Sequence, residues 1–351
     1  MNNIKKIIIV LAMLFIMVSI FKGCMNGNTY SKIGYKGNLP KVGATIYKYD
    51  DEFMSYIRNS MENDAYGRIA LTMNDSQNDQ NLQLQQVDEM ILKGARALAI
   101  NLVDPKAAQY VLNKAKVVNL PIIFFNKEPE KSVLNSYDKV WFVGTDSKES
   151  GILQGKMIVD LWNENKNKWD KNHDGKLSYV LLKGEPGHPD AEARSKYALD
   201  EIKKAGIPVE ELARASAMWD AVMAKDKMDG WISKFNDRIE FVISNNDVMA
   251  LGVLDSLEKA GYLSVNKFIP VVGIDAIPAA VKKIKEGTMV GTILNDASSQ
   301  GKAIIDLVTN AANGKKMNQG TSWKIDDNKY IRIHYVTIIK NNTDIAEQSY
   351  K

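Results

Sequence analysis

The feature that most constrains this chain is the regular alternation, from residue 41 onward, of short apolar runs with longer stretches of helical spacing. The apolar runs cover residues 44–47, 69–73, 97–102, 121–125, 141–144, 177–182, 239–243, 269–273 and 290–294. Helical patterns cover residues 53–65, 81–93, 105–117, 149–163, 191–204, 221–234, 247–260, 277–285 and 300–312. Because the short runs are apolar on both faces, they predict parallel sheets covered by helices and built from right-handed βαβ units.

These strands are too numerous for one comfortable sheet, and the series restarts near residues 141–144, after which Thr145-Asp146-Ser147 begins a new helix. We therefore predict an α/β protein with two doubly wound, Rossmann-like lobes and a ligand cleft between them. The period-two pattern of residues 330–336 predicts a segment that crosses between the lobes. A length of 351 residues allows two domains of ordinary size.

The first residues have the plan of a secretory signal. Lys5 and Lys6 precede an apolar run at 7–21, which ends in Lys22-Gly23-Cys24. Cys24 is the only cysteine, so an intrachain disulfide is excluded, and its position resembles a bacterial lipoprotein cleavage site. We predict a lipoprotein-type signal peptide at 1–23, acylation of Cys24, and a flexible tether at 24–40. Lys22 stands where a small apolar residue is usual, which leaves an uncleaved signal anchor as the alternative.

Both interpretations of the N-terminus, the lipoprotein signal peptide and the uncleaved signal anchor, place the remaining chain outside the cytoplasmic membrane. The net charge of +4 is small against 46 basic and 42 acidic residues, and no block of Lys and Arg suggests a nucleic-acid surface. Apart from the N-terminus, no apolar run approaches the length of a membrane span. We therefore expect a membrane association through the anchor only, and no nucleic-acid partner.

The stretch KGEPGHPDAEAR at 183–194 brings an imidazole, a carboxylate and a guanidinium to a predicted strand-to-helix junction. Pro189 suits a first helical turn, and Asp190 and Arg194 are four residues apart, so they share a helix face. In an open α/β sheet, ligands bind at such junctions. The alternative is a capped helix start with a surface ion pair.

Polar side chains also follow the other predicted strands, and they include Asp51, Asn126, Asn246, Asp275 and Asn295. Asn and Asp are common helix N-caps, which is the alternative interpretation for each of them. Taken together with His188, Asp190 and Arg194, they favour a polar ligand. A sugar hydroxyl both donates and accepts, so it suits Asp beside Asn or Arg, and Phe53 or Trp219 offers an aromatic plate for the apolar face of a pyranose.

A second candidate site is the stretch DKNHDGKLS at 170–178, which matches the front of a calcium-binding loop. Oxygens at its first, third and fifth positions converge on one ion, and glycine at the sixth permits the turn. Leu181 stands where such a loop normally ends in a glutamate, so a carboxylate must come from elsewhere. The alternative is a polar turn without metal, and the sequence shows no Cys/His cluster for zinc.

Several runs resemble the type I periplasmic-binding-protein family, and in particular its D-galactose/D-glucose-binding members. The similarity covers nearly all of the chain from residue 41, and it is strongest at 45–51, 73–80, 124–129, 143–151 and 183–194. It implies two Rossmann-like lobes joined by a three-strand hinge, with a sugar between them. The resulting boundaries are 41–145 plus 297–331 for the N-terminal lobe and 146–296 plus 332–351 for the C-terminal lobe, with hinge crossings near Thr145, Asn295 and Arg332.

The resemblance also assigns site residues. Its sugar-binding positions fall on Tyr47, Asp51, Phe53, Asn126, His188, Asp190, Arg194, Trp219, Asn246, Asp275 and Asn295. Its structural calcium (Ca2+) ligands fall on Asp170, Asn172, Asp174, the Lys176 carbonyl, Ser178 and Glu240. Ser178 departs from the longer amide side chain of the family, which leaves the sixth calcium ligand open.

The function that the resemblance implies is extracytoplasmic binding of D-glucose or D-galactose by a monomer that delivers the sugar to the permease of an ABC importer. The expected location is the outer face of the cytoplasmic membrane, through a lipid on Cys24, or the periplasm. One alternative is a sensor that presents the closed form to a chemoreceptor or sensor kinase. A more distant one is a glycoside hydrolase with Asp190 and Asp275 as its carboxyl pair, although we expect no enzyme. A sugar-responsive repressor of the same fold would need a helix-turn-helix where this sequence has an export segment.

Overall fold

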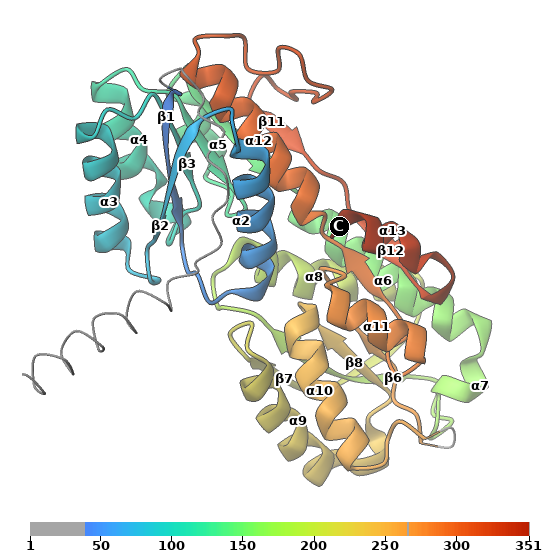
Figure 1. Ribbon diagram of the computed structural model, residues 1–351. Helices are drawn as coiled ribbons and strands as arrows, with labels where there is room; N and C mark the ends of the chain where they lie inside the picture. Colours follow the sequence, from blue (N-terminus) through green and yellow to red (C-terminus); the bar gives the residue numbers. More distant parts are fainter. Residues whose placement is uncertain (1–38, 265–266, 351) are drawn as a thin grey trace, which may run out of the picture. The chain divides into compact units, whose positions relative to one another are not determined.

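The computed structural model describes residues 39–264 and 267–350 (Figure 1). The predicted signal peptide, Cys24 and nearly all of the tether lie outside the described residues. Residues 39–351 form one compact unit of alternating strands and helices, and this confirms the predicted α/β fold class. In the described ranges, none of the helices combines the length and hydrophobicity needed to span a membrane.

The strands of the N-terminal lobe form a six-stranded parallel sheet with the order β11-β5-β4-β3-β1-β2. Their bounds are β1 Lys41–Ile46, β2 Ala70–Asp75, β3 Ala97–Ile100, β4 Ile122–Phe125, β5 Val140–Gly144 and β11 Tyr330–Arg332. The central strands β3 and β4 are buried at every position, as their uninterrupted apolar sequences predict.

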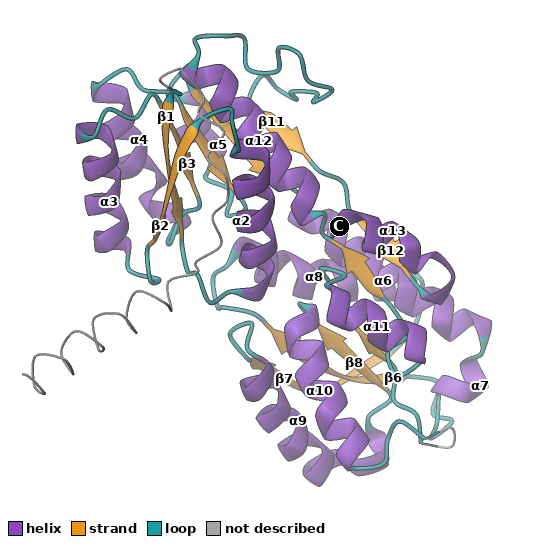
Figure 2. Cartoon of the chain, in the orientation of Figure 1, coloured by secondary structure: helices purple, strands orange, loops and turns teal. Residues whose placement is uncertain are grey.

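Helices cover both faces of this sheet (Figure 2). One core joins the sheet to α2 (Glu52–Ala65) and α12 (Ala297–Ala312), and the other joins it to α3 (Gln80–Leu92) and α4 (Ala108–Val117). The predicted helix at 105–117 begins instead as a short 3-10 turn, Pro105–Ala107, capped by Asp104. A further short helix, α5 (Lys131–Asn135), precedes β5.

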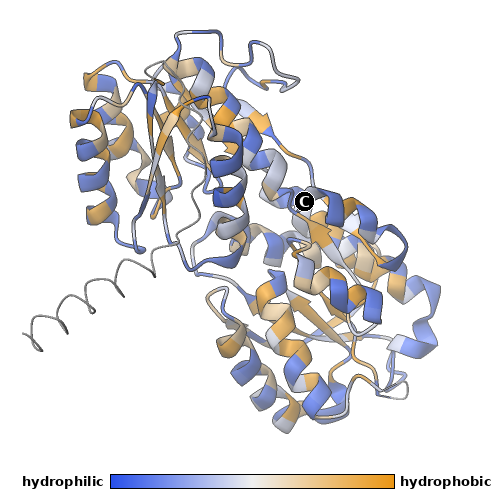
Figure 3. Ribbon diagram, in the orientation of Figure 1, coloured by the Kyte–Doolittle hydropathy of each residue, from blue (hydrophilic) through white to orange (hydrophobic). Residues whose placement is uncertain are grey.

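The strands of the C-terminal lobe form a four-stranded parallel sheet with the order β7-β6-β8-β9. Their bounds are β6 Leu177–Lys183, β7 Val209–Ser216, β8 Phe241–Ser244 and β9 Val271–Val272. One face packs on α6 (Ser147–Glu164), α7 (Lys166–Trp169) and α8 (Pro189–Lys204), and the other on α9 (Ala221–Phe235), α10 (Asp247–Lys259) and α11 (Pro278–Glu286). In Figure 3 the strands are predominantly hydrophobic, and the helices carry hydrophilic residues on their outer faces.

Three segments connect the two lobes. The chain passes from β5 into α6, from β10 (Thr292–Leu294) into α12, and from β11 into β12 (Val336–Ile338). β12 pairs antiparallel with β10, and α13 (Thr343–Ser349) follows it. Arg332 braces this region, because its guanidinium donates to the Thr145 carbonyl at 2.7 Å and pairs with Glu128.

The strand β7 is absent from the sequence prediction. Its sequence, VEELARAS, carries charged residues along an edge strand, so it contains no apolar run. Glu211 and Arg214 pair with each other on its exposed surface, which explains why the sequence pattern concealed the strand.

Candidate functional site

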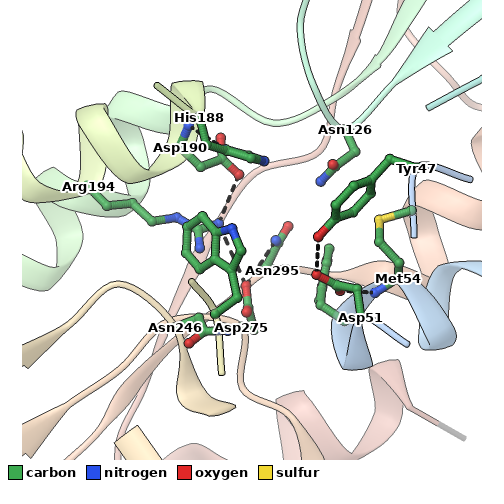
Figure 4. Close-up of a pocket in the computed structure, with 12 residues that line it drawn as sticks. Tyr47, Asp51, Met54, Asn126, His188, Asp190, Arg194, Asn246, Asp275 and Asn295 are labelled. Atoms are coloured by element: carbon green, nitrogen blue, oxygen red, sulfur yellow. Dashed lines mark hydrogen bonds and ion pairs between the residues drawn. The ribbon is translucent and has the colours of Figure 1, made fainter. Parts of the chain in front are cut away.

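A pocket with a free volume of about 30 Å³ lies between the two lobes, where the strands of both sheets end (Figure 4). This free volume is about that of one water molecule and lies far below the roughly 300–1,000 Å³ of most ligand sites, because the lining side chains fill most of the space between the lobes. The structure brings together all eleven residues that the sequence proposed as sugar-binding, and it adds Met54. The lining residues are Tyr47, Asp51, Phe53, Met54, Asn126, His188, Asp190, Arg194, Trp219, Asn246, Asp275 and Asn295.

Arg194 is the centre of the polar network on the C-terminal lobe. It projects from α8, is 3% exposed, and donates to the Asn245 carbonyl at 2.9 Å. Its Nη2 lies 3.2 Å from Asp190 Oδ2 and 3.6 Å from Asp275 Oδ1. Asp190 and Arg194 share a helix face, as their spacing predicts, and they form an ion pair there. Burial favours the neutral form of Asp190, but Arg194 together with His188 and the Ser147 hydroxyl outweighs it, and the pKa of Asp190 lies below its usual value.

His188 is both the N-cap of α8 and a wall of the pocket. Its Nδ1 accepts a hydrogen bond from the Asp190 amide at 3.1 Å, so Nε2 carries the proton of the neutral ring. Burial lowers the pKa of His188 to about 3, and the ring is therefore neutral at physiological pH. Its ring meets the edge of Trp219 with centroids 5.2 Å apart.

Asp275 lies just beyond β9 with a φ of 120°, a strained value for a residue with a side chain. Asn295 donates to its Oδ1 at 3.1 Å, and the Tyr350 hydroxyl donates to its carbonyl at 2.8 Å. Burial raises the pKa of Asp275 to about 7, although the Arg194 guanidinium opposes the shift. The carboxyl of Asp275 is therefore poised to gain or lose a proton near neutral pH.

Asp51 shows that a helix cap and a pocket residue can be the same side chain. Its Oδ1 accepts from the Met54 amide at 2.8 Å and thereby caps α2. Its Oδ2 accepts from the Tyr47 hydroxyl at 2.5 Å, at the pocket wall. Helix cap and ligand contact, the two interpretations that the sequence allowed for Asp51, are therefore compatible.

The three asparagine side chains of the pocket differ in which of their atoms remain available to a ligand. Asn126 adopts a left-handed conformation (φ 62°), and its side-chain oxygen accepts from Asn101 at 3.2 Å, so its NH2 group remains available. Asn246 caps α10 through its side-chain oxygen, which leaves the same group available. Asn295 is more constrained, because its amide donates to Asp275 and its oxygen accepts from Gln300 at 2.7 Å.

Trp219 and Phe53 form the aromatic part of the pocket. Phe53 is in the first turn of α2 and is 8% exposed. Trp219 has a left-handed backbone (φ 65°), and its indole lies directly over Gly184. A Cβ at position 184 would approach the indole to 2.1 Å, so glycine is required there for the ring to occupy its place.

Sequence reasoning missed Lys127, which is 2% exposed beside the pocket. Its Nζ donates to the Val103 carbonyl at 2.9 Å and lies 3.9 Å from the centroid of the Tyr47 ring. It also pairs with Glu185 of the other lobe at 3.6 Å. Burial lowers the pKa of Lys127, and Glu185 counteracts that shift. A lysine in a loop normally indicates a solvated surface, so only its position next to Asn126 hinted at this role.

Tyr335 was also missed. Its buried hydroxyl lies 2.8 Å from Thr145 Oγ1 and accepts from Arg194 at 3.3 Å. The side chain therefore connects two of the segments between the lobes to the central arginine of the pocket.

The pocket as a whole offers acceptors, donors and apolar plates in one small space. Three carboxylates can accept hydrogen bonds, while His188 Nε2, Arg194 and two amide groups can donate them. This combination suits a compact, neutral ligand with many hydroxyl groups. A raised carboxyl pKa is also found at catalytic sites, so the geometry by itself does not separate binding from glycoside hydrolysis.

The predicted calcium loop connects α7 to β6, with Gly175 in the left-handed conformation (φ 80°) that the sharp turn requires. Asp170 is buried, and its Oδ1 has no hydrogen-bond partner among the described residues. Glu240 faces the same loop and accepts from the amides of Lys171 at 2.7 Å and Ser178 at 2.9 Å. These features fit a cation loop.

Two other features of this loop fit a cation less well. Asn172 and Asp174 use their side-chain oxygens on amides of the loop, and the Ser178 hydroxyl donates to Glu210 at 3.3 Å. Within residues 39–264 and 267–350, no three His, Cys, Asp or Glu side chains approach closely enough to hold a metal ion. The Lys176 amide donates to Asp174 at 2.8 Å, and His173 is exposed.

Comparison with known proteins places these observations in context. Residues 42–316 match the family model described as periplasmic binding protein domain. The chain is 50% identical, over 86% of its length and 90% of the relative, to the D-galactose/methyl-galactoside binding periplasmic protein MglB of Haemophilus influenzae. It is 28% identical to the xylitol-binding protein of Mycolicibacterium smegmatis, over 87% of this chain and 79% of the relative.

The fold comparison agrees. The crystal structure of an ABC transporter solute binding protein from Bacillus halodurans with bound myo-inositol superimposes with a TM-score of 0.75. The match covers 90% of this chain and all of the other, at 28% identity.

Proposed function

Since this chain belongs to the family of periplasmic binding proteins, which bind sugars outside the cytoplasm for ABC import, we propose that it binds D-glucose or D-galactose between its two lobes. The observation that carries the proposal is the composition of the pocket. Every polar side chain expected of a hexose site from the sequence lines one space, together with Phe53 and Trp219. The 50% identity to a galactose-binding relative supports a hexose over other polyols.

In this proposal the carboxylates of Asp51, Asp190 and Asp275 accept from sugar hydroxyls, and Arg194 and His188 donate to them. Hydrogen bonds to charged groups contribute about 1.5–3 kcal/mol each. The apolar C–H faces of the ring pack against Phe53 and Trp219. Because His188 is neutral and donates through Nε2, it can orient a sugar hydroxyl without placing a charge in the pocket.

The sugar stabilises a closed arrangement because the two lobes contribute different contacts. Asp51, Phe53 and Asn126 follow strands of the N-terminal sheet, while His188, Asp190, Arg194, Asn246 and Asp275 follow strands of the C-terminal sheet. A ligand that contacts both sets has a higher affinity for the closed state than for the open one and therefore shifts the population toward it. The closed form is the form that docks on the permease.

The calcium site stays part of the proposal. Asp170, Asn172, Asp174, Ser178 and Glu240, with the Lys176 carbonyl, would hold the ion, and its role there would be to stabilise the turn that leads into β6. The unpartnered Asp170 Oδ1 supports this assignment.

The cellular setting is likewise proposed from the sequence. A lipid on Cys24 would hold the protein at the outer face of the cytoplasmic membrane, with an ABC permease as its partner. The same closed form could also be presented to a chemoreceptor or sensor kinase, which would use the same pocket.

The second candidate function is glycoside hydrolysis, because Asp275 has the raised pKa of a general acid. The relatives that the chain matches carry binding functions in their names, which favours transport. Incubation with an aryl galactoside separates the two: release of free sugar would support the hydrolase, and an intact glycoside supports the binding protein.

The direct test of the proposed function is tryptophan fluorescence titrated with D-glucose, D-galactose, D-ribose and L-arabinose, with and without a calcium chelator. Because Trp219 lines the pocket, a bound sugar changes the environment of its indole. We expect saturable changes with the two hexoses at concentrations far below those needed for the pentoses. Equal responses to all four sugars, or none, would contradict the proposal.

A further inference from the structure

A much larger cavity lies at the outer edge of the N-terminal lobe, away from the hexose pocket. Its volume is about 820 Å³, and it lies where strands β4 and β5 begin, since Pro121 and Lys139 line it. The loop that follows α12 forms its other wall, at the end of the lobe where β1 also begins (Figure 1). It shares no lining residue with the hexose pocket.

All of the charged side chains that line this cavity are basic. Arg96, Lys139, Lys315 and Lys316 line it, and its other lining residues are apolar side chains, glycine and amides. Within the part of the chain that the structure describes, none of these four cations forms a salt bridge, although many other surface lysines do. A cluster of unpaired cations around a hollow attracts anions such as phosphate groups.

The loop that carries two of these lysines is held in place. Asn310 on α12 donates to the carbonyls of Met317 at 2.8 Å and Gln319 at 3.0 Å, and its own carbonyl accepts from the Lys315 amide at 2.9 Å. Trp323 further along donates to Asp306 at 2.8 Å. The lysines are therefore presented by an ordered wall.

The cavity is also adjacent to the point where the described chain begins. The Arg96 amide donates to the Lys41 carbonyl at 2.8 Å, so the first residue of β1 contacts a residue of the cavity wall. In the sequence, the predicted anchor at Cys24 precedes this first strand. The half-buried Trp141 lines the cavity as well, and indole rings favour the level of lipid head groups.

We propose that this basic cavity binds the phosphate head groups of anionic phospholipids, so that the outer edge of the N-terminal lobe rests on the membrane surface. The inference rests on the proposed anchoring at Cys24 for its cellular setting, because a short tether keeps this edge within reach of the bilayer. Attraction of basic side chains to an anionic leaflet raises surface binding roughly fivefold per residue. Four such residues are enough to favour a resting orientation, and salt would weaken it.

The test uses the full chain with nanodiscs in excess, made either of phosphatidylcholine alone or of phosphatidylcholine mixed with phosphatidylglycerol. Hydrogen–deuterium exchange is measured for the peptides that cover residues 311–319 and 117–121. The variant Lys315→Glu with Lys316→Glu removes two of the cations. The matched control is Lys203→Glu with Lys204→Glu, an exposed pair at the end of α8 in the other lobe.

We expect exchange in these peptides to be at least severalfold slower with phosphatidylglycerol than without it, in the wild type and in the control variant but not in Lys315→Glu/Lys316→Glu. Equal exchange in the two kinds of nanodisc would overturn the proposal. Equal protection by inorganic phosphate without nanodiscs would also overturn it, because it would indicate a site for a small soluble anion. Mass spectrometry of Cys24 in the same sample reports the anchoring separately, so the two failures are distinguishable.

Discussion

Lys127 and Glu185 form an ion pair between the two lobes beside the pocket, with Nζ and Oε2 3.6 Å apart. Lys127 follows β4 of the N-terminal lobe and is buried, while Glu185 follows β6 of the C-terminal lobe. The pair therefore contributes to the closed arrangement and must break when the lobes separate. Lys127 also contacts the ring of Tyr47, a predicted sugar-binding residue of its own lobe, so the ion pair connects the predicted site to the other lobe.

Glu185→Gln should weaken hexose binding two- to fivefold, which corresponds to about 0.5–1 kcal/mol for a partly exposed ion pair. The change removes the counter-charge of Lys127 in the closed state only. Isothermal titration calorimetry measures the effect. Glu192→Gln is the matched control, because Glu192 pairs with Lys183 within one lobe and its loss should leave the affinity unchanged. Equal effects of the two variants would show that the pair between the lobes has no special role.

Asp275 should make the affinity and the stability depend on pH. Its folded-state pKa of about 7 is raised, so the folded protein binds a proton more tightly than the unfolded chain. The free energy of unfolding should therefore fall as pH rises from about 4 to 7 through this group, while hexose affinity should rise as the carboxylate forms. Asp275→Asn should remove both dependences and weaken binding at least tenfold. Urea unfolding and calorimetry at pH 5 and pH 8 measure them, and unchanged slopes in the variant would exclude Asp275 as their source.

Gly184→Ala should weaken hexose binding at least tenfold by displacing the indole of Trp219, since the new Cβ would meet that ring at 2.1 Å. The position of Trp219 also sets its fluorescence, so the emission of the unliganded protein should change. Gly230→Ala provides the control. It lies within α9 with open space around its Cβ, and it should raise stability by about 0.5–1 kcal/mol without altering affinity. Normal affinity in Gly184→Ala would show that the pocket does not need the indole in this place.

Removal of calcium should lower the unfolding temperature of the wild type, because an ion that binds only the folded state stabilises it. The difference should vanish in Asp170→Ala, which loses the buried carboxylate at the first position of the loop. Asp226→Ala, an exposed substitution on α9, should keep the wild-type response. Scanning calorimetry with and without a chelator measures this. If the chelator left the unfolding temperature of the wild type unchanged, the proposed calcium site would be contradicted.

Much of this molecule was predictable because its sequence carries strong local signals. Buried strands such as β4 are uninterrupted apolar runs, and Pro189 marks the start of α8 where the structure has it. The pocket residues could be proposed because Asn and Asp gather where strands end. The two interpretations of these residues, cap or ligand contact, proved compatible in Asp51 and Asn246, which cap a helix with one atom and face the pocket with another.

Other features depend on contacts between distant segments, which leave no local pattern. β7 is a charged edge strand, and its sequence resembles that of a surface loop. The sequence around Lys127 predicts a solvated lysine, because only the folded chain brings Glu185, in the loop after β6, next to it. Tyr335 and Tyr350 lie near the C-terminus, and only the folded chain places their hydroxyls on Arg194 and on the Asp275 carbonyl.

The central claim is that one hexose holds the two lobes closed. The most direct test is the distance between spin labels at Gln77→Cys and Val222→Cys, two exposed positions on opposite lobes, in a chain whose native cysteine is replaced by Cys24→Ser. Double electron–electron resonance should show a single short distance with saturating D-glucose or D-galactose, and a longer, broader distribution without sugar. A distribution that saturating hexose leaves unchanged would contradict the account.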